Sequence, residues 1–253
     1  MKFTQGAVIL VTAAVASLAP VATTPAAATP ASAVTTSHAA APACRVTANI
    51  RVGQSPFGVA ANPKTNTIYV TNPSNGTVSV ISGRTSTVVA TVPVGLDPRG
   101  VAANPKTNTI YVAIADNSVS VINGRTNTVV ATVPVGFGPS GVAANPRTNT
   151  IYVTNSSGGT VSVISGRTST VVATVPVGLD PEGVAANPKT NTIYVTNSSS
   201  GTVSVINGRT STVVATVPVG FEAIGVAANP KTSIIYVTNE SGYTVSVLTC
   251  GRK

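Results

Sequence analysis

The segment GVAANPKTNTIYV at residues 58–70 decides the fold, because the chain repeats it four more times. It returns unchanged at 100–112 and 183–195, as GVAANPRTNTIYV at 141–153 and as GVAANPKTSIIYV at 225–237. The units begin at Val52, Val94, Val135, Val177 and Val219, so successive starts are 42, 41, 42 and 42 residues apart. A fixed period of this length is typical of proteins built from repeated supersecondary units.

Each unit contains four strand-like pieces, which in the first are GVAAN, TIYVT, TVSVI and TVVATV. The segment NPKTN lies between the first two and is expected to form a turn, because proline presets the backbone of a turn. SGRTS or NGRTN separates the last two, and its glycine is expected to take a positive φ. Four short strands in about 42 residues predict one blade of an all-β, five-bladed β-propeller. A β-solenoid is the alternative, although its coils usually have shorter periods.

The fifth unit stops after its third strand, at TVSVLT (244–249), and the missing piece is found at the other end of the chain. RVTANI (45–50) aligns with the fourth strand TVVATV (87–92) of the first unit. We therefore expect this N-terminal strand to complete the last blade and close the ring, which would leave no unpaired edges at the join.

The two cysteines fit the same closure. Cys250 aligns with Gly83 and Cys44 with Ser86, the two ends of the turn between the third and fourth strands. The ends of such a turn lie under about 7 Å apart, within reach of a disulfide. A Cys44–Cys250 disulfide is therefore predicted, and two unpaired thiols are the alternative.

The first 43 residues differ in composition from the rest. One lysine, an apolar run and then small residues predict a secretory signal peptide over 1–28, with cleavage after Ala28 or, alternatively, after Ala33. The Ala/Thr/Pro-rich stretch 29–43 is expected to be a spacer, and 44–253 to be the propeller. An uncleaved anchor is the alternative for the leader, but the apolar run is short for a span and meets Pro20. We expect a secreted, extracellular protein whose mature chain has no membrane span. Association with the cell surface is an alternative within this prediction.

The motif TIYVTN at 67–72, 150–155 and 192–197, with IIYVTN at 234–239, resembles that of the YVTN-repeat (YncE-like) β-propellers, a family that includes surface-layer-type proteins. The resemblance covers essentially all of 45–249. It implies an extracytoplasmic propeller with WD40-like repeats, usually of seven blades, so five blades are a departure. Some related propellers are lyases, but no catalytic set of residues carries over. In the second unit YVAIAD (111–116) replaces YVTN, and its loop is expected to differ.

The composition argues against several kinds of site. The single histidine, His38, lies in the leader, so a mature domain has neither a Ser-His-Asp triad nor a His-ligated zinc site. No cofactor or metal is expected. Six carboxylates remain as candidates for a polysaccharide-active hydrolase or lyase-type enzyme, and the loops after the VG steps place three of them at equivalent positions: Asp97, Asp180 and Glu222. Solvated loop acids are the simpler interpretation.

Charge separates by face if strand direction alternates within each blade. Nine cations fall in the turns after the first and third strands, on one face: Lys64, Arg84, Lys106, Arg125, Arg147, Arg167, Lys189, Arg209 and Lys231. We call this set the basic face. All six carboxylates fall on the opposite side, together with Arg51 and Arg99.

A concentration of like charge attracts polyanions, so the basic face is a candidate for docking on a cell-wall polymer, an acidic polysaccharide or another polyanion. The alternative is that these cations are solubilising turn residues multiplied by duplication. The sequence thus predicts a non-catalytic binding or cell-surface scaffold, with self-association as a further option. The recurring Leu96, Phe137, Leu179 and Phe221, like the repeated tyrosines, are interpreted as packing residues between blades, with a channel mouth as the alternative place for the Leu and Phe positions.

Overall fold

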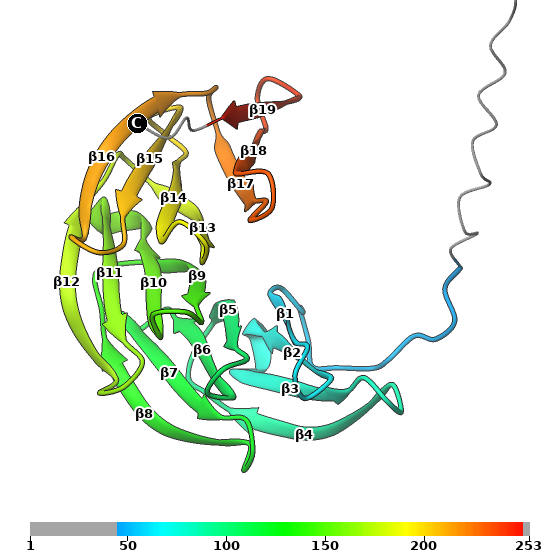
Figure 1. The fold of residues 1–253 in the computed structure, drawn as a ribbon. Coiled ribbons are helices and arrows are strands. Elements are labelled where there is room, and N and C mark those ends of the chain that lie inside the picture. Colours follow the sequence, from blue (N-terminus) through cyan, green and yellow to red (C-terminus); the bar gives the residue numbers. More distant parts are fainter. Residues whose placement is uncertain (1–44, 250–253) are drawn as a thin grey trace, which may run out of the picture. The chain divides into compact units, whose positions relative to one another are not determined.

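The computed structural model describes residues 45–249, which form five antiparallel sheets and no α-helix (Figure 1). The first sheet contains β1 (Val59–Asn62), β2 (Thr67–Asn72), β3 (Thr77–Ser82) and β4 (Thr87–Pro93). The second contains β5 (Pro98–Asn104), β6 (Thr109–Ile114), β7 (Ser118–Asn123) and β8 (Thr128–Pro134). In both sheets each strand pairs with the next strand along the chain.

The third and fourth sheets repeat this meander. The third contains β9 (Pro139–Asn145), β10 (Thr150–Asn155), β11 (Thr160–Ser165) and β12 (Thr170–Pro176). The fourth contains β13 (Pro181–Asn187), β14 (Thr192–Asn197), β15 (Thr202–Asn207) and β16 (Thr212–Pro218). Two 3-10 turns, η1 (Pro73–Asn75) and η2 (Ser156–Gly158), lie in loops between second and third strands.

The fifth sheet has three strands, β17 (Ala223–Ala228), β18 (Ile234–Asn239) and β19 (Thr244–Thr249). The predicted fourth strand is not formed, because Arg45–Ile50 carry no strand and all but Ile50 are exposed. In the other sheets the fourth strand follows the third through a short turn. In the fifth sheet, residues 45–50 would have to pair with β19, about 200 residues later in the chain, and closing so long a loop costs entropy. Five sheets are therefore present, but the predicted closure is not seen. Residues 1–44, Cys44 and Cys250 lie outside the described residues.

The sheets pack in chain order through their first strands, β1 against β5, β5 against β9, β9 against β13 and β13 against β17. Figure 1 shows β1 at one end of this row and β17 at the other. Each junction has one apolar cluster, in which a tyrosine and third-strand valines of one sheet meet isoleucine, leucine or valine side chains of the next. In the third junction these are Tyr152, Val161 and Val163 against Ile193 and Ile206, all at most 2% exposed. The tyrosines were thus correctly predicted as packing residues in four of the five sheets.

The last two residues of the TIYVTN motif have separate roles. Thr71, Thr154 and Thr196 each donate a hydrogen bond of 2.8 Å across the junction, to the carbonyl oxygens of Arg99, Glu182 and Ile224. The asparagine stays within its own sheet, where the Nδ2 of Asn155 donates to Ser162 at 3.0 Å and to Thr160 at 2.9 Å. The second sheet has Ala113 and Ile114 at these positions. In the loop that follows, Asn117 takes a φ of 65°, where the first, third and fourth sheets have the glycines Gly76, Gly159 and Gly201, so this loop differs as predicted.

Replacing Thr154 by Ala should lower the free energy of unfolding by about 1–3 kcal/mol, because the buried hydroxyl also accepts from the Gly141 amide at 2.7 Å and both backbone partners would lose it. The converse change, Ala113→Thr, restores the residue found in the other sheets and should raise stability by about 1 kcal/mol. Urea unfolding of the two variants measures both signs. A stabilising Thr154→Ala change would contradict the role given to this bond.

Candidate functional site: the basic face

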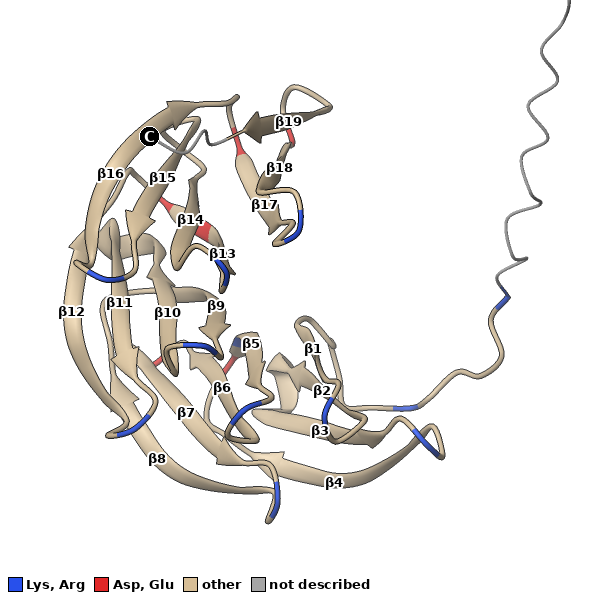
Figure 2. Cartoon of the chain, viewed as in Figure 1, with Lys and Arg blue, Asp and Glu red and all other residues tan. Residues whose placement is uncertain are grey.

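The turns between first and second strands lie against those between third and fourth strands. The Gly83 amide donates to the Asn66 carbonyl at 2.8 Å, and the same bond joins Gly124 to Asn108, Gly166 to Asn149 and Gly208 to Asn191. The two sets of turns therefore share one side of each sheet. Figure 2 shows the Lys and Arg residues of the basic face at these turns, and all nine side chains are exposed.

The glycine of the SGRTS turn was wrongly predicted to supply a positive φ. In this turn the later residue takes it, at 55° in Ser86, 54° in Asn127, 53° in Ser169 and 55° in Ser211. Glycine is required by close approach instead, because a Cβ on Gly83 would lie 2.3 Å from the Asn66 Oδ1 atom. The absence of a side chain on Gly83 lets the arginine-bearing turn lie directly against the lysine-bearing turn.

Side-chain amides connect the basic face from sheet to sheet. The Nδ2 atom of Asn62 donates to the Oδ1 of Asn108 at 2.8 Å, and Asn104 donates in the same way to Asn149, and Asn145 to Asn191. Each donor also accepts from its own turn, as in the bond of 3.1 Å from the Lys64 amide to Asn62. Buried asparagine side chains therefore tie each lysine- or arginine-bearing turn to the next in the first four blades.

Three of the cations converge where the third and fourth sheets meet. Arg147, Lys189 and Arg209 line a hollow of about 400 Å³, whose other walls are Thr148, Thr190, Asn191 and Gly208. The Nη1 atom of Arg147 donates to the Lys189 carbonyl at 3.1 Å, so the guanidinium spans the junction. Within residues 45–249 no cation of the basic face forms an ion pair, since the single salt bridge joins Arg99 to Asp97 on the other side. The hollow therefore offers uncompensated positive charge.

The carboxylates occupy the opposite side, where the loops after second and fourth strands meet, as in the bond from the Val94 amide to the Gly76 carbonyl. Hydroxyl groups hold several of them. Ser140 donates to Glu182 at 2.6 Å, Ser118 to Asp116 at 2.5 Å, and Ser241 to Glu222. Asp97, Asp180 and Glu222 take equivalent turn positions as predicted, with φ of 47°, 54° and 53°. Among the described residues no group of three His, Cys, Asp or Glu side chains is placed to hold a metal ion.

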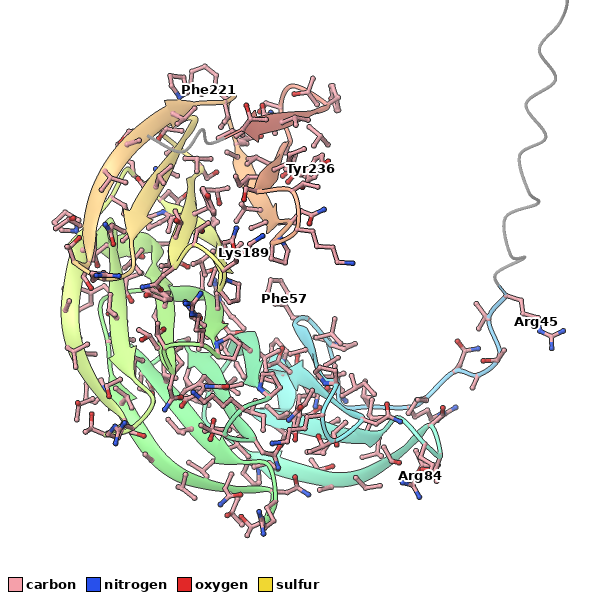
Figure 3. All side chains as sticks on the ribbon, in the orientation of Figure 1. Arg45, Phe57, Arg84, Lys189, Phe221 and Tyr236 are labelled. Carbon is pink, nitrogen blue, oxygen red and sulfur yellow. The ribbon has the colours of Figure 1, made fainter. Side chains whose placement is uncertain are left out.

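The recurring apolar residues of this side were wrongly predicted to pack between sheets. Leu96, Phe137, Leu179 and Phe221 are 77%, 71%, 68% and 73% exposed, because they stand at the turn that leaves one sheet for the next. Figure 3 shows Phe221 pointing outward from the turn between β16 and β17.

Comparisons with known proteins bear on the fold. No family model matches the chain, and no curated protein matches it. Among solved structures, a chain of Kuenenia stuttgartiensis hydrazine synthase superposes with a TM-score of 0.67, at 24% sequence identity and over 77% of this chain. The chain has a β-propeller fold. It spans 59% of the hydrazine synthase chain, and at this identity the likeness concerns the fold alone. Residues 45–249 form no helix that is long and apolar enough to cross a membrane.

Burial of the blade tyrosines has a consequence at high pH. Burial raises the pKa of Tyr152 to about 12, against an ordinary value of 10.0. The folded chain therefore keeps this proton in a range where the unfolded chain releases it. The resulting stability is complete below about pH 10 and is lost as the pH rises toward about 12.

We expect the free energy of unfolding to fall by about 1–2 kcal/mol more in the parent chain than in Tyr152→Phe between about pH 9.5 and 11.5. The Phe variant should fold well, because the Tyr152 hydroxyl is buried with no hydrogen-bond partner in the described part of the chain. Urea unfolding at the two pH values measures the difference. Equal losses in both chains would show that Tyr152 does not carry the effect.

Proposed function

We propose that the chain is a secreted, non-catalytic propeller of the YVTN-repeat (YncE-like) kind, and that it serves as a binding or cell-surface scaffold docking on polyanions through the basic face. The observation that supports docking most directly is the separation of charge. Nine exposed cations share one side of the blades, where no carboxylate of the described residues pairs with them, and amide bonds tie the lysine- or arginine-bearing turns of the first four blades to one another.

The repeated geometry favours a polymer over a small ligand. The repeat places a similar set of three cations at each of the three junctions among the first four blades. Arg147, Lys189 and Arg209, which line the hollow, are the set between the third and fourth blades. A polymer with regularly spaced phosphate or sulfate groups contacts several sets at once, so weak single contacts add up through effective concentration. The fit of such groups to guanidinium and ammonium donors supports a cell-wall polymer or acidic polysaccharide as the partner.

Retention of the full chain on immobilised polyphosphate, heparin and neutral dextran tests the proposal. We expect binding to both anionic matrices and none to dextran, with elution as salt rises from about 0.05 to 0.5 M, because exposed charges are screened at high ionic strength. A preference for polyphosphate over heparin would identify phosphate as the recognised group, and the reverse would identify sulfate. Equal retention on all three matrices would contradict docking by charge.

A further inference from the structure

Two pockets repeat each other residue for residue, one in the first blade and one in the fourth. Their volumes are about 420 and 310 Å³, at the small end of the range for ligand sites. In each, the walls are the VG step that precedes the blade, the end of the loop between the second and third strands, and the third and fourth strands. We call them the hydroxyl pockets. Their hydroxyl groups belong to Thr77, Ser79 and Thr91 in the first blade and to the corresponding Thr202, Ser204 and Thr216 in the fourth.

The hydroxyl pockets combine these groups with apolar surface and have no charge in common. Val213, in the fourth strand of the fourth blade, is 36% exposed, and Val88 takes its place in the first-blade pocket. Among the lining residues only Arg51 carries a charge, and the fourth blade has Pro176 at that position. The repeated chemistry therefore suits a neutral ligand that has both polar and aliphatic groups.

A buried serine in each pocket has a hydrogen-bond donor that nothing in the described chain accepts. Ser79 and Ser204 are 2% and 1% exposed. Each accepts a bond from the asparagine of its own YVTN motif, at 3.0 Å from Asn72 and 2.9 Å from Asn197. A hydroxyl group donates one bond besides those that it accepts, but within residues 45–249 neither serine donates. Because buried polar groups need partners, each pocket offers a donor to an oxygen atom of a ligand.

The second blade shows the arrangement without the asparagine. Ile114 stands at that position, and the corresponding serine, Ser120, donates its hydroxyl to the Val94 carbonyl oxygen at 2.7 Å. The protein itself therefore satisfies this donor. In the first and fourth blades the asparagine amide binds the serine oxygen instead, and the serine makes no such bond to the VG step in the described chain.

We propose that the hydroxyl pockets bind N-acetylated amino sugars, with the acetamido group of the sugar inside the pocket. The acetamido carbonyl oxygen is a stronger acceptor than a sugar hydroxyl and takes the hydrogen of Ser79 or Ser204. The acetamido methyl group meets the aliphatic surface of Val88 or Val213, and the threonine hydroxyls are left for the hydroxyl groups of the sugar.

An exposed apolar residue borders the fourth-blade pocket. Leu179 directly follows the lining residue Gly178, and its backbone amide donates at 2.8 Å to the hydroxyl of Ser200, which also lines the pocket. The Leu179 side chain is 68% exposed. It offers an apolar surface to the C–H face of a sugar ring, which gives a role to a residue that does not pack between blades.

Titration calorimetry of the full chain with chitotriose, the trimer of N-acetylglucosamine, tests the proposal. Cellotriose is the matched ligand, because it has the same linkage and a hydroxyl in place of each acetamido group. We expect chitotriose to bind at least about tenfold more tightly, since cellotriose offers the serine no carbonyl. Raising salt from about 0.05 to 0.5 M should change the chitotriose affinity less than about twofold, because the ligand is neutral. Equal affinity for the two trimers, or no binding of chitotriose, would overturn the proposal.

Serine variants locate the binding. Ser79→Ala together with Ser204→Ala removes both donors and should weaken chitotriose binding at least about tenfold. Ser120→Ala is the matched control, because it also removes a buried serine but one whose hydroxyl already bonds to Val94, and it should bind within about twofold of the parent. Parent affinity in the double variant would overturn the proposal.

A second pair of variants covers the case in which the buried changes prevent folding. Thr91 and Thr216 are exposed and their side chains form no hydrogen bond in the described chain, so exchange for valine of the same shape should keep the fold. We expect Thr91→Val with Thr216→Val to weaken chitotriose binding about fivefold. Unchanged affinity would overturn the placement of the sugar in these pockets. Dextran carries no acetamido group and polyphosphate is charged, so this proposal and docking through the basic face fail or stand separately.

Discussion

Replacing Lys106, Arg147, Lys189 and Arg209 together by Gln is expected to weaken binding to polyphosphate about a thousandfold at about 0.1 M salt. If each cation neutralises one phosphate, the slope of log affinity against log salt falls by about 3, because fewer counterions are released. The four residues lie at consecutive junctions and include the three that line the hollow. They are exposed turn residues without carboxylate partners in the described chain, and the change removes one exposed side-chain bond, from Arg147 to the Lys189 carbonyl, so we expect the fold to stay intact. Titration of fluorescent polyphosphate at three salt concentrations gives both quantities.

A matched control separates position from net charge. Val89, Val130, Val172 and Val214 are 57–61% exposed on the outer strands, and changing all four to Glu lowers the net charge by four, as the Gln variant does. The control should bind within about threefold of the parent, since its new charges stand on the outer strands rather than in the turns of the basic face, and salt screens them. If both variants lose affinity equally, net charge alone attracts the polymer, and the basic face has no special role.

The repeat made most of the fold predictable, because its residues act locally. Alternation in TIYVT and TVSVI specified the strands, and proline or glycine specified their ends. The number of sheets followed from the number of copies. Closure was harder, because it depends on how many degrees each junction turns, and that angle arises from packing between blades. The sequence pattern within one blade does not specify the angle between neighbouring blades.

The basic face was predictable for a related reason: which side a turn takes follows from strand direction alone. The hollow at Arg147, Lys189 and Arg209 was not, since it depends on neighbouring blades. Nor was the exposure of Phe137 and Phe221, because a residue beside a VG step in sequence can leave the sheet before the next one begins. The Asn62–Asn108 bond had a signal in the sequence, namely an asparagine repeated at both ends of every NPKTN turn but the last, where Ser233 stands.

That last substitution explains a defect in the row. Asn187 has a buried Nδ2 atom without a partner in the described residues, because Ser233 is too short to supply the Oδ1 acceptor found at the other junctions. Together with the exposed face of β18 and β19, this marks the fifth blade as the least firmly held of the row.

Gly183→Ala should lower the free energy of unfolding by about 3 kcal/mol or more, because the added methyl group meets backbone of the next blade. Its Cβ would lie 2.2 Å from the Ile224 carbonyl oxygen, 3.0 Å from the Thr196 hydroxyl and 3.3 Å from Val226. Relief requires the fourth and fifth blades to separate. That movement breaks the bond of 2.8 Å from Thr196 to Ile224 and exposes the cluster around Tyr194 and Ile235.

Gly158→Ala provides the matched control, because the nearest atoms to its Cβ lie 3.5 Å away, at ordinary van der Waals distance. We expect it to change stability by less than about 0.5 kcal/mol. Since neighbouring blades support one another, Gly183→Ala should also broaden the urea transition by uncoupling the fifth blade from the rest. A sharp transition at the parent midpoint would show that the inner strands tolerate a side chain here, and that close backbone approach is not what holds the blades together.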